Sequence, residues 1–145
     1  MQIYNLKNKP EYIEEVAKLE RDEWGANTSK TLEEKVAKIK QNFQNEYFEK
    51  LILLDHEELI GFISMFEYDM EECKDLKPWY ATMYVKKEYR GKGYSKLLNE
   101  ALLNLAKEKG IPRLYLKTTL NNYYEKFGAK FLENVGDEKI LYFDL

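Results

Sequence analysis

The chain has 145 residues, which is the size of a single domain and is long enough to bury a core without covalent cross-links. Apolar residues make up 44% of the sequence and the formal net charge is −3, so we expect a packed globular protein and not a dedicated nucleic-acid-binding one. The single cysteine, Cys73, and the single histidine, His56, exclude an intrachain disulfide and Cys-rich or multi-histidine metal sites.

The first third of the chain predicts a short strand followed by two helices. Residues 2–6 read as the strand, and Pro10 suits the first turn of a helix that Gly25 ends. Thr31 and Glu34 have the spacing of a capping box, in which each side chain satisfies a free backbone N–H at a helix start. Apolar residues then recur at helical spacing from residue 32 to residue 47, which predicts one buried helix face.

The middle of the chain changes to a strand pattern. The apolar runs 51–54 and 59–66 flank a polar turn that contains His56, which predicts an antiparallel hairpin. An acidic stretch, 67–77, separates this hairpin from a third run of aromatic and β-branched residues at 79–85.

The remaining elements complete a mixed sheet. A glycine turn at 90–95 precedes a long amphipathic helix, which Gly110 and Pro112 terminate. A strand at 114–116, a short helix capped by Asn121 or Asn122 and a hairpin built from 131–132 and 140–145 follow. The predicted order βααβββαβαββ places residues 1–145 in one domain of the α/β (α+β) class.

The turn at 90–95 has the features of a phosphate-binding loop. The first N–H groups of the following helix have no intrahelical partner and lie at the positive end of the helix dipole. Glycine lets the backbone approach a ligand closely, and Arg90, Lys92 and Lys96 add positive charge. The Walker A pattern fails because no glycine stands at the required upstream position, and the Rossmann pattern fails because Lys96 occupies the third glycine position. ATP and NAD are therefore disfavoured.

Two motifs resemble those of the GNAT N-acetyltransferase superfamily. Within 84–95, Arg90 and Gly93 match the family's acyl-CoA loop, [Q/R]-x-x-G-x-[G/A], while Ser95 replaces the last small residue and could cap the helix. Within 123–129, the family's segment of an aromatic residue, Tyr-Glu-Lys, any residue and Gly-Phe is matched except that Ala129 replaces the final aromatic. The order of elements agrees with the family over nearly the whole chain.

The resemblance implies a mostly antiparallel central sheet flanked by helices, with acetyl-CoA as co-substrate and no metal. It implies that the pyrophosphate binds backbone N–H groups of 91–96. The strand that carries Tyr84 and Val85 is expected to splay from the strand at 114–118, so that the Val85 N–H can stabilise the oxyanion. The residues that this resemblance assigns to the cofactor are Met83, Tyr84, Val85, Arg90, Gly91, Lys92, Gly93, Tyr94, Ser95, Lys96 and Asn122.

The same resemblance assigns the general acid to Tyr124, because the acid directly precedes Glu-Lys. A phenol with a pKa near ~10 can protonate a thiolate whose conjugate acid has a pKa near ~8.5. Tyr123 is expected to pack in the core, and Asn122 either contacts the pantetheine amide or caps the helix. Glu67, which ends a strand and could face the cleft, is the candidate base, with deprotonation through water as the alternative.

The acceptor is expected to be a small-molecule or peptide amine. Residues 67–75 contain five acids against one lysine, so this segment either attracts a cationic amine or is a solvated loop. A transferase that uses a longer acyl-CoA and a non-catalytic acyl-CoA-binding or interaction module remain open. Nucleic-acid binding through Lys86, Lys87 and the basic loop is disfavoured.

The sequence also leads to expectations about location and assembly. The first ten residues lack the apolar run of a signal peptide, and no segment reaches the ~18 apolar residues of a membrane span. A cytoplasmic protein without membrane contact is therefore expected. The resemblance also allows a homodimer.

Overall fold

A computed structural model describes residues 1–25 and 31–145 of the chain, and its centre is one seven-stranded sheet. The strands stand in the order β1-β2-β3-β4-β5-β7-β6, and every neighbouring pair is antiparallel except β4–β5. Their bounds are β1 (Gln2–Asn5), β2 (Glu49–Asp55), β3 (Glu58–Phe66), β4 (Trp79–Val85), β5 (Arg113–Thr118), β6 (Lys130–Val135) and β7 (Glu138–Asp144). The predicted mixed, mostly antiparallel sheet is confirmed.

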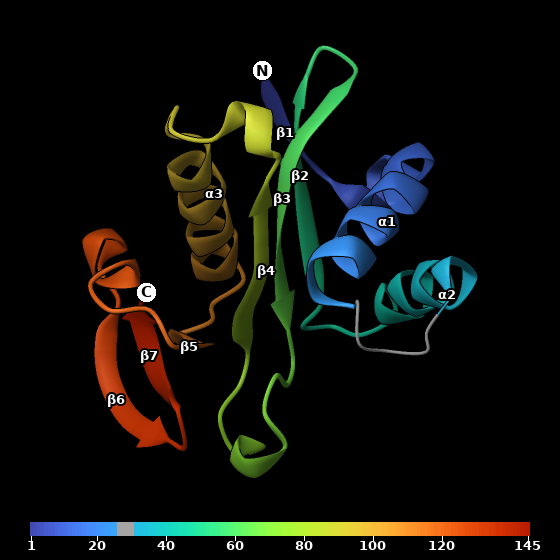
Figure 1. Ribbon diagram of the computed structural model, residues 1–145. Coiled ribbons are helices and arrows are strands. Elements are labelled where there is room, and N and C mark those ends of the chain that lie inside the picture. Colours follow the sequence, from blue (N-terminus) through green and yellow to red (C-terminus); the bar gives the residue numbers. More distant parts are fainter. Residues whose placement is uncertain (26–30) are drawn as a thin grey trace.

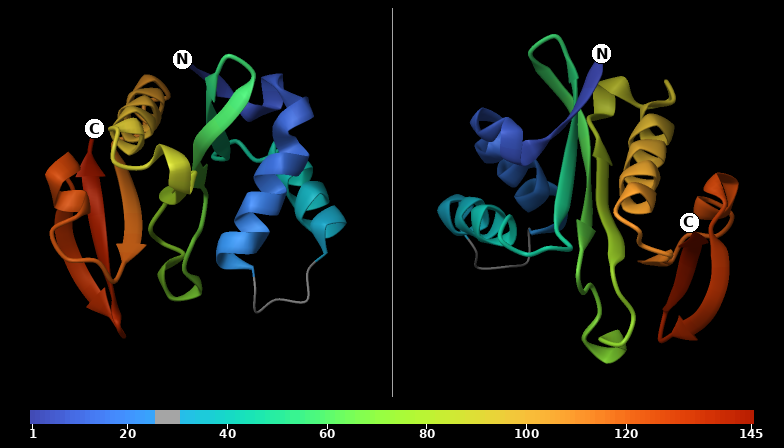
Figure 2. Two further views of the ribbon diagram at one scale, coloured as in Figure 1. Left: turned by 45° about the horizontal axis from the view of Figure 1, so that its top comes forward. Right: turned by 180° about the vertical axis from the view of Figure 1, so that it is seen from behind.

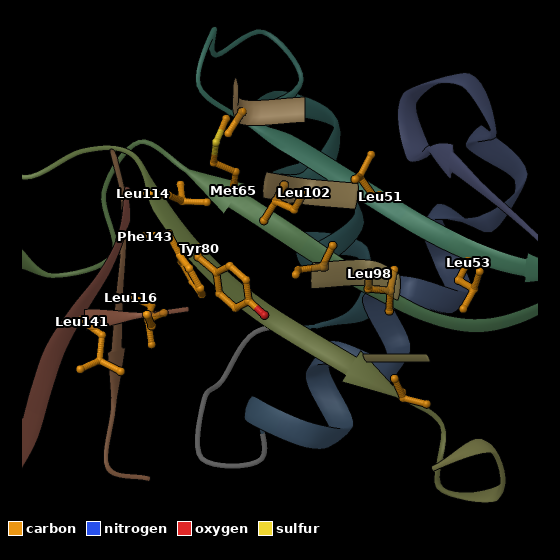
Figure 3. Close-up of a cluster of buried hydrophobic side chains, with 14 of the residues drawn as sticks. Leu51, Leu53, Met65, Tyr80, Leu98, Leu102, Leu114, Leu116, Leu141 and Phe143 are labelled. Carbon is orange, nitrogen blue, oxygen red and sulfur yellow. The ribbon is translucent and has the colours of Figure 1, made fainter. Parts of the chain in front are cut away.

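In the described part of the chain, three α-helices cover the two faces of the sheet: α1 (Ile13–Trp24), α2 (Leu32–Asn42) and α3 (Tyr94–Glu108). Helices α1 and α2 lie on one side of strands β1–β4 and α3 lies on the other (Figures 1 and 2). Successive side chains of a strand point to opposite faces, and β2 follows this rule. Leu51 and Leu53 pack in the cluster beneath α3 (Figure 3), while Ile52 and Leu54 pack beneath α1 and α2.

The start of α2 is confirmed and its end is not. The Thr31 hydroxyl accepts a hydrogen bond from the Glu34 N–H at 3.1 Å, as the capping box predicts. The helix ends at Asn42, although the apolar spacing predicted that it would continue to Tyr47. The Asn45 side chain accepts from the Tyr47 N–H at 2.8 Å, so a local side-chain contact competes with the helical bond at that point.

Two capping predictions in the second half of the chain are wrong. Residues Tyr124–Phe127 form a short 3₁₀-helix whose first flanking residue is Tyr123, without a side-chain cap from either asparagine. Helix α3 is preceded by Gly93 in the left-handed conformation, so Ser95 lies in its first turn and does not cap it. The predicted end of α3 is confirmed, because Gly110 follows it with a φ of +78°.

Strand β4 contains a β-bulge opposite β3. Phe62 pairs with Tyr84 and Ser64 pairs with Ala81, so two β4 residues face a single β3 residue between these pairs. One of the two, Thr82, has a φ of +49°. A β-branched residue in this region is a true outlier, and such a conformation costs about 1–3 kcal/mol unless its surroundings hold it in place.

Beyond the bulge, β4 and β5 separate. They are paired only at Trp79 and Tyr115, near the start of β4, and the sheet is open along the rest of that strand. Strands β5, β7 and β6 accordingly stand apart from the end of β4 in Figure 1. The splay that the family resemblance implied is therefore present.

A Gly61→Ala substitution should destabilise the protein without changing its fold class. A Cβ at Gly61 would lie 2.4 Å from the Tyr84 carbonyl oxygen and 3.2 Å from a Leu98 methyl group, so β3 and β4 would have to move apart beneath α3. We expect a loss of about 3 kcal/mol in the free energy of unfolding, at the upper end of the range for overpacking because the clash is with backbone, measured by urea denaturation.

Gly136→Ala is the matched comparison, because it makes the same change at a position with open space around it. Only its left-handed φ of +61° opposes the new side chain, at a cost of about 1 kcal/mol. Equal losses in the two variants would contradict close packing at Gly61.

Candidate active site

A cavity of about 340 Å³ lies between the end of β4 and the start of α3. Gly91 and Gly93 both have φ near +80°, and a Cβ built on either would meet no atom within 4 Å. The helix geometry directs the free N–H groups of the first turn of α3 toward this space. The lining residues are Glu23, Met83, Tyr84, Val85, Tyr89, Arg90, Gly91, Gly93, Tyr94, Ser95 and Tyr123. This cavity (the loop cavity) can hold an anionic group.

Arg90 braces the loop against β4. Its Nε donates to the Val85 carbonyl at 2.8 Å, and its guanidinium lies 5.5 Å from the centre of the Tyr84 ring. Lys92 and Lys96 are exposed and do not line the loop cavity, so the structure places them at its margin. The loop therefore offers backbone N–H groups and one positioned guanidinium, with two outer lysines.

The register of β3 and β4 fixes the direction of the Val85 backbone groups. The Lys86 N–H bonds to the Ile60 carbonyl at 3.0 Å, so Ile60 and Lys86 form a hydrogen-bonded pair. Such pairs alternate with non-hydrogen-bonded ones in an antiparallel ladder, so Val85 and Gly61 form a pair of the second kind. The Val85 N–H consequently points away from β3, toward the side on which β5 has separated from β4.

A second cavity, of about 460 Å³, lies on the other side of the bulge. It is lined by Trp24, Asp69, Tyr80, Ala81, Thr82, Met83, Leu116, Lys117, Tyr124 and Glu138. Met83 lines both this cavity (the bulge cavity) and the loop cavity. The two cavities therefore lie next to each other at the bulge, with Met83 between them.

Tyr124 lies in the bulge cavity among other aromatic rings. Its ring is 5.7 Å from Tyr80 and 4.8 Å from Tyr123, edge to face in both pairs. Burial, and secondarily the neighbouring Tyr123, raises the pKa of Tyr124 above its ordinary value. The phenol is thus held as a proton donor at neutral pH.

Asp69 is the half-buried carboxylate of the bulge cavity. Burial raises the pKa of its carboxyl group, Lys117 opposes that shift and Glu138 adds to it. The cavity thus combines two acidic side chains and one basic side chain with aromatic surfaces from Trp24, Tyr80 and Tyr124. Cations interact favourably with both kinds of group.

Glu67 is held outside both cavities. Its carboxylate accepts from Asn45 at 3.1 Å and lies 3.9 Å from the Lys77 ammonium. The residue pattern could not distinguish among the carboxylates of this stretch, because an irregular segment has no period that assigns side chains to a face. The structure places Asp69, and not Glu67, in the lining of the cavity that Tyr124 also lines.

The structure also changes the roles assigned to Asn122 and Tyr123. Asn122 is exposed and lines neither cavity. Tyr123, expected to pack in the core, packs against Phe127 at 5.8 Å but also lines the loop cavity. The positions of both side chains follow from the irregular start of the 3₁₀-helix, where Asn122 has a φ of +59°. Of the other residues assigned to the cofactor from sequence, those that line the loop cavity are Met83, Tyr84, Val85, Arg90, Gly91, Gly93, Tyr94 and Ser95.

Residues 1–25 and 31–145 contain no group of three or more His, Cys, Asp and Glu side chains that could hold a metal ion. Within the same ranges, every helix is too short or too polar to cross a membrane. His56 is exposed in the β2–β3 turn and Cys73 is buried in the β3–β4 loop, and neither side chain lines the two cavities.

Comparison with known proteins agrees with this geometry. The model of the acetyltransferase (GNAT) family matches residues 13–129. N-alpha-acetyltransferase 30 of Schizosaccharomyces pombe is 29% identical over 82 residues, which cover 53% of this chain and 54% of that protein. The chain therefore spans about half the length of this curated relative.

Solved structures extend the likeness to the whole fold. The PaiA N-acetyltransferase from Thermoplasma acidophilum, in complex with coenzyme A, is 22% identical, with a TM-score of 0.73 and complete coverage of both chains. An aminoglycoside 6′-N-acetyltransferase complexed with coenzyme A is 19% identical, with a TM-score of 0.72 over 98% of this chain and 94% of that one. At these identities the likeness concerns the fold alone. With the family match over most of its length, the chain belongs to the acetyltransferase (GNAT) family.

Proposed function

We propose that the protein transfers an acetyl group from acetyl-CoA to a primary amine. The observation that carries this proposal is that two chemically different cavities lie next to each other at the β4 bulge and share Met83 as a lining residue. One offers backbone N–H groups and positive charge, as a CoA pyrophosphate requires, and the other offers carboxylates and a tyrosine, as an amine acceptor requires. Structural neighbours crystallised with coenzyme A support the choice of the first ligand.

Residues of the loop and of β4 hold acetyl-CoA. The pyrophosphate binds the N–H groups around Gly91 and Gly93, whose missing side chains leave the open space that phosphate oxygens fill. The pantetheine arm runs along the open edge of β4 toward Met83. When bound, acetyl-CoA supplies a thioester whose carbonyl carbon accepts a nucleophile.

The side chains of the bulge cavity donate and accept the protons of the reaction. The acceptor nitrogen forms a bond to the thioester carbon, and the carbon–sulfur bond breaks. The Val85 N–H stabilises the charge that develops on the carbonyl oxygen. Asp69 takes one proton from the ammonium form of the acceptor, directly or through one water, before the nitrogen attacks. Tyr124 gives its proton to the departing thiolate and regains the proton that the nitrogen loses as the amide forms. A raised pKa suits Asp69 to this role, because it brings the carboxylate closer in basicity to the amine.

The acceptor is a cationic amine in its free form. Asp69 and Glu138 are only partly balanced by Lys117, and an ammonium group supplies the missing positive partner. The acids Glu71 and Glu72 of the same loop are exposed, and Glu71 pairs with Lys74 at 3.1 Å. Selection of the acceptor therefore depends on Asp69 more than on the total charge of the loop.

Coenzyme A should raise the melting temperature of the protein, and a Gly93→Val substitution should abolish that shift. A valine at Gly93 would occupy the phosphate position and would oppose the left-handed φ of +84°. Thermal shift with coenzyme A, acetyl-CoA, NAD and ATP measures the effect, with circular dichroism to verify folding. Stabilisation by NAD without stabilisation by coenzyme A would contradict the proposed ligand.

A Tyr124→Phe substitution should lower kcat while leaving the affinity for coenzyme A unchanged. The substitution removes the proton donor and keeps the ring that packs against Tyr80 and Tyr123. Loss of a general acid typically lowers kcat by about 10²–10⁴-fold. Release of free thiol from acetyl-CoA in the presence of amines provides the assay. Coenzyme A binding without thiol release in the parent protein, across a broad set of amines, would instead support a non-catalytic binding module.

An Asp69→Asn substitution should lower kcat/KM for a cationic amine by about 10²–10³-fold, as expected for the loss of a base. Glu72→Gln is the matched control, since it removes one acid from the same loop but outside the bulge cavity. We expect the control to stay within about threefold of the parent, because exposed charges are screened by salt. Equal losses in both variants would indicate general attraction by the loop and would exclude a specific role for Asp69.

A further inference from the structure

A chain of buried polar side chains connects α1 to the bulge in β4. The Lys50 ammonium donates hydrogen bonds to Glu20 and to the hydroxyl of Ser64. The Thr82 hydroxyl donates to the same Ser64 oxygen at 2.6 Å. Glu20, Lys50 and Ser64 are 5%, 1% and 0% exposed, so water does not replace these contacts. The chain crosses from α1 through β2 and β3 to β4, which lie in this order in Figure 1.

A contribution to stability does not by itself account for this network of buried polar side chains. Lys50 lies 5.0 Å from the Phe62 ring and 5.9 Å from the Phe66 ring, in a region that apolar residues could fill. Replacement of a buried ion pair by well-packed apolar residues of similar volume is often neutral or stabilising. The position of this network of polar side chains suggests that it contributes to backbone geometry, because its last member, Thr82, has the unusual backbone conformation.

The network affects the backbone of β4 at Thr82. Its φ of +49° is unfavourable for a β-branched residue and persists only when the surroundings determine it. Its hydrogen bond to Ser64 ties the side chain to the face covered by α1 and α2, while the backbone bulges where β4 leaves β5. Met83, the next residue, lines both cavities, and the Val85 N–H follows two residues later.

We propose that Glu20, Lys50 and Ser64 are positioning residues that hold Thr82 in the left-handed conformation and thereby aim the β4 backbone at the thioester. The consequence for catalysis rests on the function proposed above, whereas the effect on the backbone does not. The network thus acts through Thr82 and touches neither substrate.

The first test is a Ser64→Ala variant compared with the parent protein. The tie to Thr82 is lost, so the bulge relaxes and kcat should fall by about 10–100-fold, the range expected when reacting groups are misplaced by roughly 1 Å. The affinity for coenzyme A should change less than kcat does, because the Gly91–Gly93 loop, which holds the pyrophosphate in the proposed function, is not disturbed. Lys109→Met is the control, since it removes a different ion pair, with Glu49 at 2.9 Å, and should keep the parent kcat.

A double-mutant cycle separates positioning from packing. Glycine adopts a positive φ without a side-chain tie, so Ser64→Ala should have little effect on kcat when it is made in a Thr82→Gly background. The same loss of kcat in both backgrounds would overturn the proposal.

If Ser64→Ala fails to fold, Thr82→Val provides the same comparison with the parent protein. This substitution keeps the shape of the side chain and leaves Glu20, Lys50 and Ser64 intact. It should lower kcat as Ser64→Ala does, and an unchanged kcat would overturn the proposal.

Backbone NMR shifts of the ligand-free protein give a readout that does not depend on activity. Ser64→Ala and Thr82→Val should both move the resonances of residues 82–85, and Lys109→Met should not. If the parent protein releases no thiol from acetyl-CoA, the proposed function fails while this comparison still tests the network. Unchanged shifts at residues 82–85 in both Ser64→Ala and Thr82→Val would overturn the positioning proposal.

Discussion

The interruption of hydrogen bonding between β4 and β5 is the constraint on which the site depends. The two strands pair only at Trp79 and Tyr115, so the later part of β4 has backbone groups that no neighbouring strand uses. Unpaired backbone groups are costly when they are buried, and an open edge resolves this cost only if water or a ligand reaches it. The two cavities lie along this edge, and Val85 directs its N–H toward it.

A sheet opened in this way still needs a continuous core to keep its two parts in a fixed relation. That core lies on the α3 side, where one cluster includes residues of β2, β3, β4, β5 and β7 together with α3 (Figure 3). Tyr80 is central to it, because its ring lies 5.5 Å from Phe143 of β7 and 5.7 Å from Tyr124. The side chain that holds the two parts of the sheet together therefore also supports the proposed acid.

The elements and the phosphate loop could be predicted from sequence, because local rules govern both. The apolar run of β2, the capping pair Thr31 and Glu34, and glycines where the backbone turns left-handed each depend on a few neighbouring residues. The bulge at Thr82, the place of Asp69 in its cavity and the contact of Lys50 with Glu20 depend on residues far apart in the chain. Lys50 stands in a strand whose apolar neighbours gave no indication that an ammonium would be buried among them.

In the function proposed above, ligand preference follows from local charge and not from the total. The formal net charge of −3 suggests a mildly acidic surface, yet the charged groups of the two cavities differ. The loop cavity has Arg90 and the positive end of α3 against Glu23, and the bulge cavity has Asp69 and Glu138 against Lys117. An anionic donor would therefore be favoured on the loop side of Met83 and a cationic acceptor on the other side. In that case the two substrates would be ordered around the reacting bond without any requirement for a large or deeply buried site.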